Sequence, residues 1–410
     1  MTTELRVLRP SEWDSWLSCL ERGFGAVPAP PESRELWLSL TEYDRFLGLW
    51  DGADCVGTTG AYSFRLTVPG GAAVPAAGVT MVSVAATHRR RGALTAMMRR
   101  QLDDVRSWGE PLAVLTASEP AIYGRFGYGA ATREMRLDIE TSRVRLARPA
   151  GSDEVELRYA DPVEALAACE GVYARLAPGR PGTPVRRPNW DRTAVADPER
   201  DRSGASPLQC VLAERDGEVV GYATFRTKPD WGRTGPTGTV TLRDLGALDP
   251  ASYASLWRFL FDIDLMTRVE CDNRPADDPL LHLVDDVRRC DVRVMDGLYV
   301  RLVEVGAALE ARTYRTPVDV VLEVEDAFCP WNAGRWRLTA DREGGATCRR
   351  TEDEADLELS VRELGSVYLG GVSLASLAAA GRVRELRPGA LAEAGAAFSW
   401  DVEPWLPHGF

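Results

Sequence analysis

The chain has 410 residues, too many for one ordinary hydrophobic core, so two or three domains are expected. Its composition, 45% hydrophobic and 27% charged, is typical of a soluble globular protein, and no apolar run approaches the roughly 20 residues that span a bilayer. A formal net charge of -12 argues against nucleic acid or an anionic membrane as a partner and suits a cationic substrate. The first residues lack the apolar region of a secretory signal, so a cytoplasmic location is expected.

The chain opens with a predicted strand followed by a predicted helix. Residues 4–8 alternate between polar and apolar side chains, as in a half-buried strand. Ser11 is expected to cap the helix that follows. The helical spacing of Trp13, Trp16 and Leu17 predicts the face of this helix that packs on the core.

A predicted hairpin and a predicted loop come next. Residues 45–68 contain two apolar runs around Asp51-Gly52, a dipeptide that is common in tight hairpin turns. Residues 69–78 are rich in proline, glycine and alanine, and we expect them to form a loop.

The densest positive charge of the chain lies where the next strand meets the next helix. An apolar run at residues 79–84 precedes three consecutive arginines, which are followed by Gly92 and an amphipathic stretch. Residues 112–117 are then expected to form another buried strand. The apolar face of the predicted helix consists of Leu94, Met97, Met98, Leu102 and Val105.

This order of elements then repeats, which indicates a duplication. Residues 155–295 again predict a strand, a helix capped by Asp161, a hairpin that turns at Asp216-Gly217, and a further strand and helix. The second copy lacks the arginine loop: the corresponding sequence, "LGALDPAS", has no basic residue. If the loop has a function, only the first copy keeps it.

The region from about residue 300 to the end is different in character. Several short alternating segments predict strands, and the segments "VRELGSVYLGG" and "SLASLAAAGRV" predict short helices. The final sequence, "FSWDVEPWLPHGF", is aromatic and rich in proline, so we expect it to pack against the protein rather than fray.

A zinc site is not expected. The chain has three histidines, and its eight cysteines are dispersed without a C-x-x-C pair. Cysteines of this kind in a cytoplasmic protein are expected to be reduced and buried. The cysteines are Cys19, Cys55, Cys169, Cys210, Cys271, Cys290, Cys329 and Cys348.

The arginine loop has the features of an anion site. The first N–H groups of a helix lack partners, the helix dipole makes that end positive, and a glycine lets the backbone approach an anion closely. The spacing Arg89-x-x-Gly92 resembles the pyrophosphate loop of GNAT N-acetyltransferases, although Leu94 stands where that loop has a second small residue. The alternative interpretation is a solvated basic helix cap.

Three motifs together resemble the enhanced intracellular survival (Eis) family of acetyltransferases: "VAATHRRRGALTAMM", "SEPAIYGRFGYG" and "LGSVYLGG…SLAAAGRV". The resemblance covers essentially the whole chain and implies a mixed α/β (α+β) fold. It implies a catalytic GNAT domain at residues 1–148, a degenerate GNAT-like domain at residues 149–298, and a sterol-carrier-protein-like domain at residues 299–410. It also implies a homohexamer that binds acetyl-CoA as co-substrate in the first domain, without a metal.

The resemblance also implies roles for particular residues. Tyr123 would be the general acid, with Tyr128 as a competing candidate, and the C-terminal carboxylate of Phe410 would be the base. Phe24 and Trp37 would form aromatic walls for the acceptor. The acetyl-CoA contacts would be Val82, Ser83, Val84, Arg89, Arg90, Gly92 and Ser118.

The resemblance implies acetyl transfer to aminoglycoside-like compounds with several amines, by direct attack of the amine on the thioester. Two positions depart from relatives that act on polycations, because Ala26 and Gly409 stand where those relatives have acids. Protein lysines or other small amines are therefore alternative acceptors. A third hypothesis is an apolar-ligand-binding protein that uses the last domain. A nucleic-acid or membrane partner is not expected.

Overall fold

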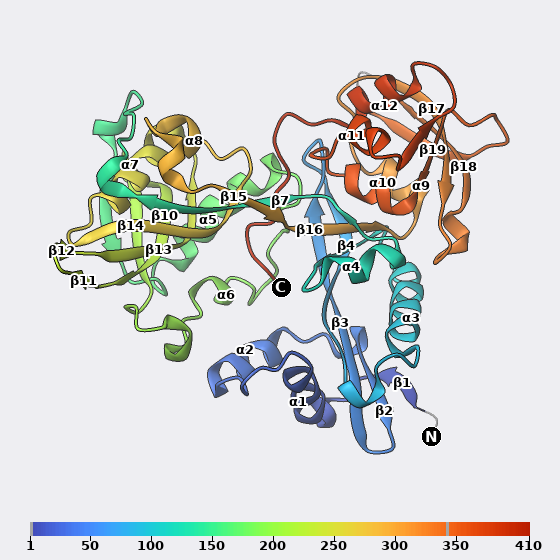
Figure 1. The fold of residues 1–410 in the computed structure, drawn as a ribbon, viewed down its shortest axis with the longest axis horizontal. Coiled ribbons are helices and arrows are strands. Elements are labelled where there is room, and N and C mark those ends of the chain that lie inside the picture. The colour runs from blue at the N-terminus through green and yellow to red at the C-terminus, as the bar shows by residue number, and fades with distance from the viewer. Residues whose placement is uncertain (1–2, 342–343) are drawn as a thin grey trace. The chain divides into compact units, whose positions relative to one another are not determined.

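The computed structural model describes residues 3–341 and 344–410, and it is a mixed α/β protein (Figure 1). The chain folds into two compact units. The first contains Met1–Thr132, Gly297–Pro404 and Gly409–Phe410, and the second contains Arg133–Asp296 and Trp405–His408. Among the described residues, no helix is both long enough and apolar enough to cross a membrane.

The first unit contains a seven-stranded sheet in which the hairpin and the strand before the arginine loop are central. Its order is β1-β2-β3-β4-β5-β16-β6. The predicted hairpin is confirmed: β2 and β3 pair through the turn that contains Gly52. The strands are β1 (Glu4–Val7), β2 (Phe46–Asp51), β3 (Asp54–Thr67), β4 (Ala73–Val84), β5 (Leu112–Thr116), β6 (Gly129–Ala130) and β16 (Leu298–Leu302).

Two local predictions for this sheet and its first helix are wrong. Residues 73–78 are not a loop, because they form the first half of β4 and pair with β3 despite Pro75. Ser11 does not cap a helix, because it lies in a 3-10 turn before α1 begins. Glu12 is the N-cap residue of α1 without a side-chain cap bond; its carboxylate instead closes the preceding 3-10 turn by accepting the Arg9 N–H, and it pairs with the Arg6 guanidinium.

The helices of the first unit's GNAT portion include the two that were expected and two that were not. The predicted apolar face of α3 is confirmed, since Met97, Met98, Leu102 and Val105 are buried. The short helix α4 carries Tyr123. The helices are α1 (Trp13–Gly23), α2 (Pro31–Leu40), α3 (Ala93–Ser107) and α4 (Pro120–Tyr123), of which α2 and α4 were not predicted.

The second unit repeats this sheet with the order β8-β9-β10-β13-β14-β7-β15. The predicted duplication is therefore visible in the topology, with the sixth strand of each sheet exchanged between the copies. The sheet of the second unit takes β7, which follows the first copy in sequence, and the first takes β16, which follows the second copy. The strands are β7 (Arg133–Glu140), β8 (Glu156–Ala160), β9 (Gln209–Arg215), β10 (Glu218–Lys228), β13 (Gly238–Ala247), β14 (Met266–Pro275) and β15 (Arg293–Asp296).

The exchange cuts across the domain ranges expected from the sequence. Strand β7 ends before residue 148 but belongs to the second unit, and β16 follows Gly297 but belongs to the first. The ranges 1–148, 149–298 and 299–410 remain a sequence-based prediction.

Helix α7 begins at a side-chain cap, because Asp249 accepts the N–H of Ser252. The predicted Asp161 cap of α5 is wrong: Asp161 accepts the N–H groups of Val163 and Glu164 in a turn, and α5 begins only after Ala165, without a side-chain cap. The predicted hairpin at Asp216-Gly217 is confirmed, since β9 and β10 pair. The remaining elements are α5 (Leu166–Leu176), α6 (Arg192–Val195), α7 (Pro250–Phe261), α8 (Leu280–Leu283) and a small hairpin of β11 (Trp231–Gly232) and β12 (Gly235–Pro236).

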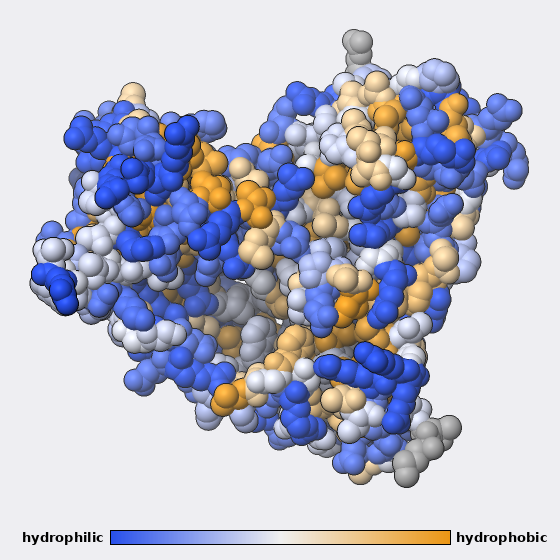
Figure 2. Space-filling model, in the orientation of Figure 1, coloured by the Kyte–Doolittle hydropathy of each residue, from blue (hydrophilic) through white to orange (hydrophobic). Residues whose placement is uncertain are grey.

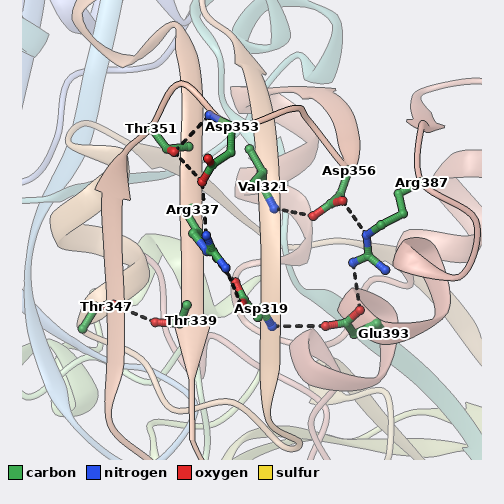
Figure 3. Close-up of polar contacts among 10 residues, drawn as sticks. All are labelled: Asp319, Val321, Arg337, Thr339, Thr347, Thr351, Asp353, Asp356, Arg387 and Glu393. Atoms are coloured by element: carbon green, nitrogen blue, oxygen red, sulfur yellow. Dashed lines mark hydrogen bonds and ion pairs between the residues drawn. The ribbon is translucent and has the colours of Figure 1, made fainter.

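The C-terminal part of the first unit has its own five-stranded sheet, in the order β19-β18-β17-β20-β21. One face of β17 and β18 is polar, with Asp319 and Arg337 paired at 2.7 Å, as Figure 3 shows. Helix α12 packs against β17 and α9 against β19. The elements are α9 (Val305–Glu310), β17 (Val318–Glu325), β18 (Gly334–Ala340), β19 (Ala346–Arg350), β20 (Leu357–Ser360), α10 (Val361–Val367), α11 (Leu374–Ala379), β21 (Val383–Glu385) and α12 (Ala390–Phe398).

The surface and the cysteines agree with the composition. Hydrophilic residues cover most of the face drawn in Figure 2, and apolar residues emerge there in separate groups. All eight cysteines are free and buried. The C-terminal segment is packed as predicted, because Pro404 and Leu406 are buried and the Trp405 indole donates to Asn273.

Candidate active site

The strand before the arginine loop is bulged and separates from its neighbour. The pairing of β3 with β4 shifts register between Thr58 and Gly60, where β4 has one extra residue, and Met81 there adopts a φ of 55°. Strand β4 pairs with β5 along Ala76–Gly78. In the described pairing, residues 79–84 have no partner on the β5 side, so their backbone groups there can bind a ligand.

The arginine loop ends in a helix start without a side-chain cap. Gly92 is the N-cap of α3 with φ 81°, a left-handed conformation that favours glycine, and Arg90 has φ 62°. No side chain bonds the first N–H groups of α3 among the described residues. These groups and the helix dipole favour an anion at this position.

Helix α3 is fixed to the sheet, which holds this anion site in place. Its buried face includes Met97 and Met98, and the buried Gln101 side chain donates to the carbonyl oxygen of Gly60 at 3.0 Å. This contact ties α3 to β3 beside the bulge. The loop and the bulged strand therefore have a fixed relation to each other.

A cavity of about 690 Å³ lies between the bulged strand, the arginine loop and the turn that carries Tyr123. This size is within the ordinary range of ligand sites, roughly 300–1,000 Å³. Nine of the residues predicted from the sequence line it: Phe24, Val82, Ser83, Val84, Arg89, Arg90, Gly92, Ser118 and Tyr123.

Sequence reasoning missed several residues of this cavity. Arg125 adds a third arginine to the lining, Glu119 adds a carboxylate, and His88 and Thr95 also line it. Arg125 and Glu119 lie within the "SEPAIYGRFGYG" motif, so their closeness to Tyr123 in sequence was the available signal. Glu119 offsets the charge of Arg125, and the lining stays positive overall because it contains three arginines and one carboxylate.

Tyr123 lines the cavity, whereas the competing Tyr128 does not belong to its lining. Tyr123 is 7% exposed, and Tyr128 is fully buried. The two rings pack edge to face with centroids 6.1 Å apart. Burial raises the pKa of Tyr123 above its ordinary value, and the negative charge of Glu119 raises it further. The geometry favours Tyr123 as a group that can reach a ligand.

The C-terminal residue is docked on the same bulged strand. The hydroxyl of Thr80 donates to the C-terminal carboxylate of Phe410 at 3.0 Å. The Phe410 ring packs against Phe64 with centroids 5.0 Å apart. Phe410 does not line the 690 Å³ cavity. Its carboxylate is bound by Thr80, two residues before Val82, and Val82 does line the cavity.

Of the two residues expected to form aromatic walls for the acceptor, Trp37 does not line this cavity. It lies half-buried on α2. Phe24 does line the cavity, and its side chain is 54% exposed. The structure therefore brings one of the two predicted aromatic residues to the site, and the role of Trp37 stays a prediction.

Comparison with known proteins agrees with this arrangement. Residues 4–131 and 182–302 match two family models described as acetyltransferase (GNAT) domains, and residues 305–407 match a sterol carrier protein domain. An uncharacterized N-acetyltransferase of Streptomyces avermitilis is 70% identical over 410 residues, which cover all of both chains. The N-acetyltransferase Eis of Mycobacterium tuberculosis is 36% identical over 389 residues, which cover 91% of each chain.

The chain belongs to the Eis family of N-acetyltransferases. The structure of Eis1 from Mycobacterium abscessus is similar over the whole of both chains, with a TM-score of 0.83 and 34% sequence identity. The resemblance inferred from the sequence is confirmed, as are the two GNAT domains and the sterol-carrier-like domain. The protein is an N-acetyltransferase.

In this Eis-family chain, the second GNAT copy differs from the first at the position of the anion site. Helix α7 starts with Pro250, which has no N–H group, and the Asp249 carboxylate accepts from the N–H and the hydroxyl of Ser252. A carboxylate thus occupies the helix start that is uncapped in α3. The second copy cannot bind a phosphate there without displacing its own cap.

Proposed function

We propose that this Eis-family protein transfers the acetyl group of acetyl-CoA to amines of multi-amine, aminoglycoside-like compounds. The observation that carries the proposal is that the arginine loop, the separated strand and Tyr123 all line the same cavity. Each of these three parts matches a different part of the reaction. Together they account for the donor, the thioester and the leaving group.

The donor would bind along the loop and the strand. Its pyrophosphate would lie at the uncapped start of α3, where Arg89, Arg90 and the N–H groups after Gly92 supply positive charge. Its pantetheine arm would pair with the free edge of β4 at Val82 to Val84. Ser118 would contact the same arm. The backbone N–H groups of this edge would then polarise the thioester carbonyl.

Tyr123 would act as the general acid. The amine nitrogen attacks the acetyl carbon, a C–N bond forms and the C–S bond breaks, and the departing thiolate takes the phenol proton. The raised pKa of Tyr123 keeps the phenol protonated at neutral pH, so the proton is available when the thiolate leaves. The phenolate regains a proton from solvent before the next cycle.

The C-terminal carboxylate of Phe410 would receive a proton from the substrate ammonium, which leaves the neutral amine that attacks the thioester. An α-carboxyl has an ordinary pKa of about 3.5, which makes it a weak base. Its role is therefore to hold the ammonium beside the thioester and to pass its proton on through water. The hydrogen bond from Thr80 fixes the carboxylate on the strand that binds the donor.

The acceptor class rests on charge and on the family. A net charge of -12 and the exposed aromatic ring of Phe24 suit a polycation. Ala26 and Gly409 stand where relatives that act on polycations have acids, so protein lysines and other small amines remain the alternative acceptors.

A homohexamer in the cytoplasm, implied by the resemblance and the sequence, is part of the proposal. Light scattering of the purified protein tests the assembly.

An apolar ligand for the C-terminal sheet region has less support. The cavity described there, of about 630 Å³, is lined by the carboxylates of Asp319, Asp341 and Glu393 and by Thr339 and Thr347. Figure 3 shows Asp319, Thr339 and Thr347 on the strands of this sheet and Glu393 on the neighbouring helix α12. Burying a lipid tail beside carboxylates would be unfavourable.

The proposal is tested with purified protein, acetyl-CoA and a panel of amines: aminoglycosides, polyamines, a lysine peptide and simple primary amines. Mass spectrometry counts the acetyl groups added to each. We expect multiple acetylation of at least one aminoglycoside. Acetylation confined to the lysine peptide or the simple amines would contradict the substrate class, and no transfer to any amine would contradict the reaction.

A further inference from the structure

The glycine-rich turn that follows Tyr123, residues 124–129, packs against segments that come much later in the chain. Strand β6 at the end of this turn pairs with β16, and α10 packs on both strands. Phe126 contacts Phe328 edge to face at 5.0 Å. The turn that carries the proposed acid is thus supported from outside by the C-terminal part of the first unit.

The first glycine of the turn lies directly against an arginine of α10. A side chain on Gly124 would place its Cβ atom 2.9 Å from Cζ and 3.0 Å from Nε of Arg362. Gly124 itself has φ -57° and ψ -32°, a conformation that any residue adopts. Its backbone therefore does not require glycine, and a Cβ atom there would displace the guanidinium of the exposed Arg362 from its place against the turn.

The other two glycines show the same close packing. A Cβ atom on Gly129 would lie 2.0 Å from the carbonyl oxygen of Arg362 and 2.4 Å from the hydroxyl of Ser366. Gly127 lies against the buried Arg301, whose guanidinium pairs with Asp326 at 2.6 Å. The turn is therefore held at three points, all of them after residue 297.

Arg362 is the member of this set that the rest of the fold needs least. Its side chain is exposed, and among the described residues its guanidinium forms no ion pair. The core contacts of α10 come instead from Val361 and Leu364, which are buried. Removing the guanidinium therefore removes the contact with Gly124 and leaves the helix in place.

We propose that Arg362 is a positioning residue for acetyl transfer: it holds the turn at Gly124 so that the adjacent Tyr123 stays in the cavity. The proposal rests on the proposed acid role of Tyr123. It gives the sterol-carrier-like part of the chain a role in catalysis besides delivering the C-terminus. The role is indirect, since Arg362 does not line the cavity.

A double-mutant cycle between Gly124 and Arg362 tests this role. The variants are Gly124→Ala, Arg362→Ala and the double variant, with Arg384→Ala as control because it is another exposed arginine of the same region, paired with Glu358 on a neighbouring strand. Thermal unfolding establishes that each is folded. The kcat, the KM for acetyl-CoA and the pH profile of kcat are then measured with an amine that the wild type acetylates.

We expect each single variant to lower kcat roughly tenfold, since small misplacements of a catalytic group cost up to about a hundredfold. The KM for acetyl-CoA should stay within about twofold. The double variant should be no worse than Arg362→Ala, because the added methyl group no longer meets a guanidinium. A displaced Tyr123 is less buried, so its pKa falls and the alkaline decline of kcat moves to lower pH.

Two results would overturn the positioning role. One is an unchanged kcat and pH profile in Arg362→Ala. The other is a double variant whose loss is the product of the two single losses, because the residues would then act independently.

Tyr123→Phe, measured beside the cycle, separates this failure from failure of the proposed mechanism. If that variant loses turnover and the cycle is additive, the positioning role alone fails. If it keeps full turnover, the acid role and the positioning role both fail.

Discussion

The hydrogen bond between Thr80 and the C-terminal carboxylate gives a sharp test of the proposed base. Thr80→Val keeps the shape of the side chain and removes the hydroxyl that donates to Phe410 at 3.0 Å. Hydrogen bonds to charged groups contribute about 1.5–3 kcal/mol, and half-exposure of Thr80 favours the lower value. A loss of about 1.4 kcal/mol corresponds to a tenfold lower kcat/KM for the amine.

The assay follows release of CoA with a thiol-reactive dye while the amine concentration varies. We expect kcat/KM for the amine to fall about tenfold and the KM for acetyl-CoA to change little, because the carboxylate is loosened but the cavity lining is intact. Thr347→Val is the matched control, since Thr347 is exposed and bonds Thr339 at 2.7 Å in the C-terminal sheet. Equal kcat/KM values for wild type and Thr80→Val would refute the assignment of Phe410.

Three further predictions concern the acid and the core. Tyr123→Phe should lower kcat roughly a hundredfold, as expected for loss of a general acid, with the KM for acetyl-CoA nearly unchanged; equal losses in both would contradict the role. In the wild type, kcat should decline only above a pH of about 10, because the phenol must be protonated and burial raises its pKa; a decline that begins below that value would contradict the assignment. Glu110→Gln breaks a buried ion pair with Arg45 at 2.6 Å and should cost about 3 kcal/mol in the free energy of unfolding, measured in urea; an unchanged midpoint would contradict this value.

The sequence was most informative where one short segment determines its own structure. Both predicted hairpins form, with the turn at Gly52-Ala53, one residue later than predicted, and at Asp216-Gly217, because a two-residue hairpin depends on local backbone conformation. The uncapped start of α3 at Gly92 is likewise local. The cavity residues were predicted from the family motifs. These motifs place the arginine loop and Tyr123 in one site, although a helix and a strand separate them in the chain.

The errors come from interactions between distant segments. The alternation of Met135, Leu137 and Ile139 in β7 signals a strand, but nothing in it shows that this strand joins the sheet of the second copy. The expected loop that contains Pro75 becomes a strand because β3 is long enough to pair with it. The contact of Gly124 with Arg362 joins residues far apart in the chain, so the local pattern gave no sign of it.

The central claim is that the cavity of the first GNAT copy alone binds acetyl-CoA and serves the reaction. Isothermal titration calorimetry of acetyl-CoA into the wild type and into Arg90→Ala tests it directly, since Arg90 lies in the loop that the second copy lacks. We predict one acetyl-CoA per chain and roughly tenfold weaker binding in the variant, as expected for loss of one charged contact to a phosphate. Two molecules per chain, or unchanged affinity in Arg90→Ala, would contradict the account.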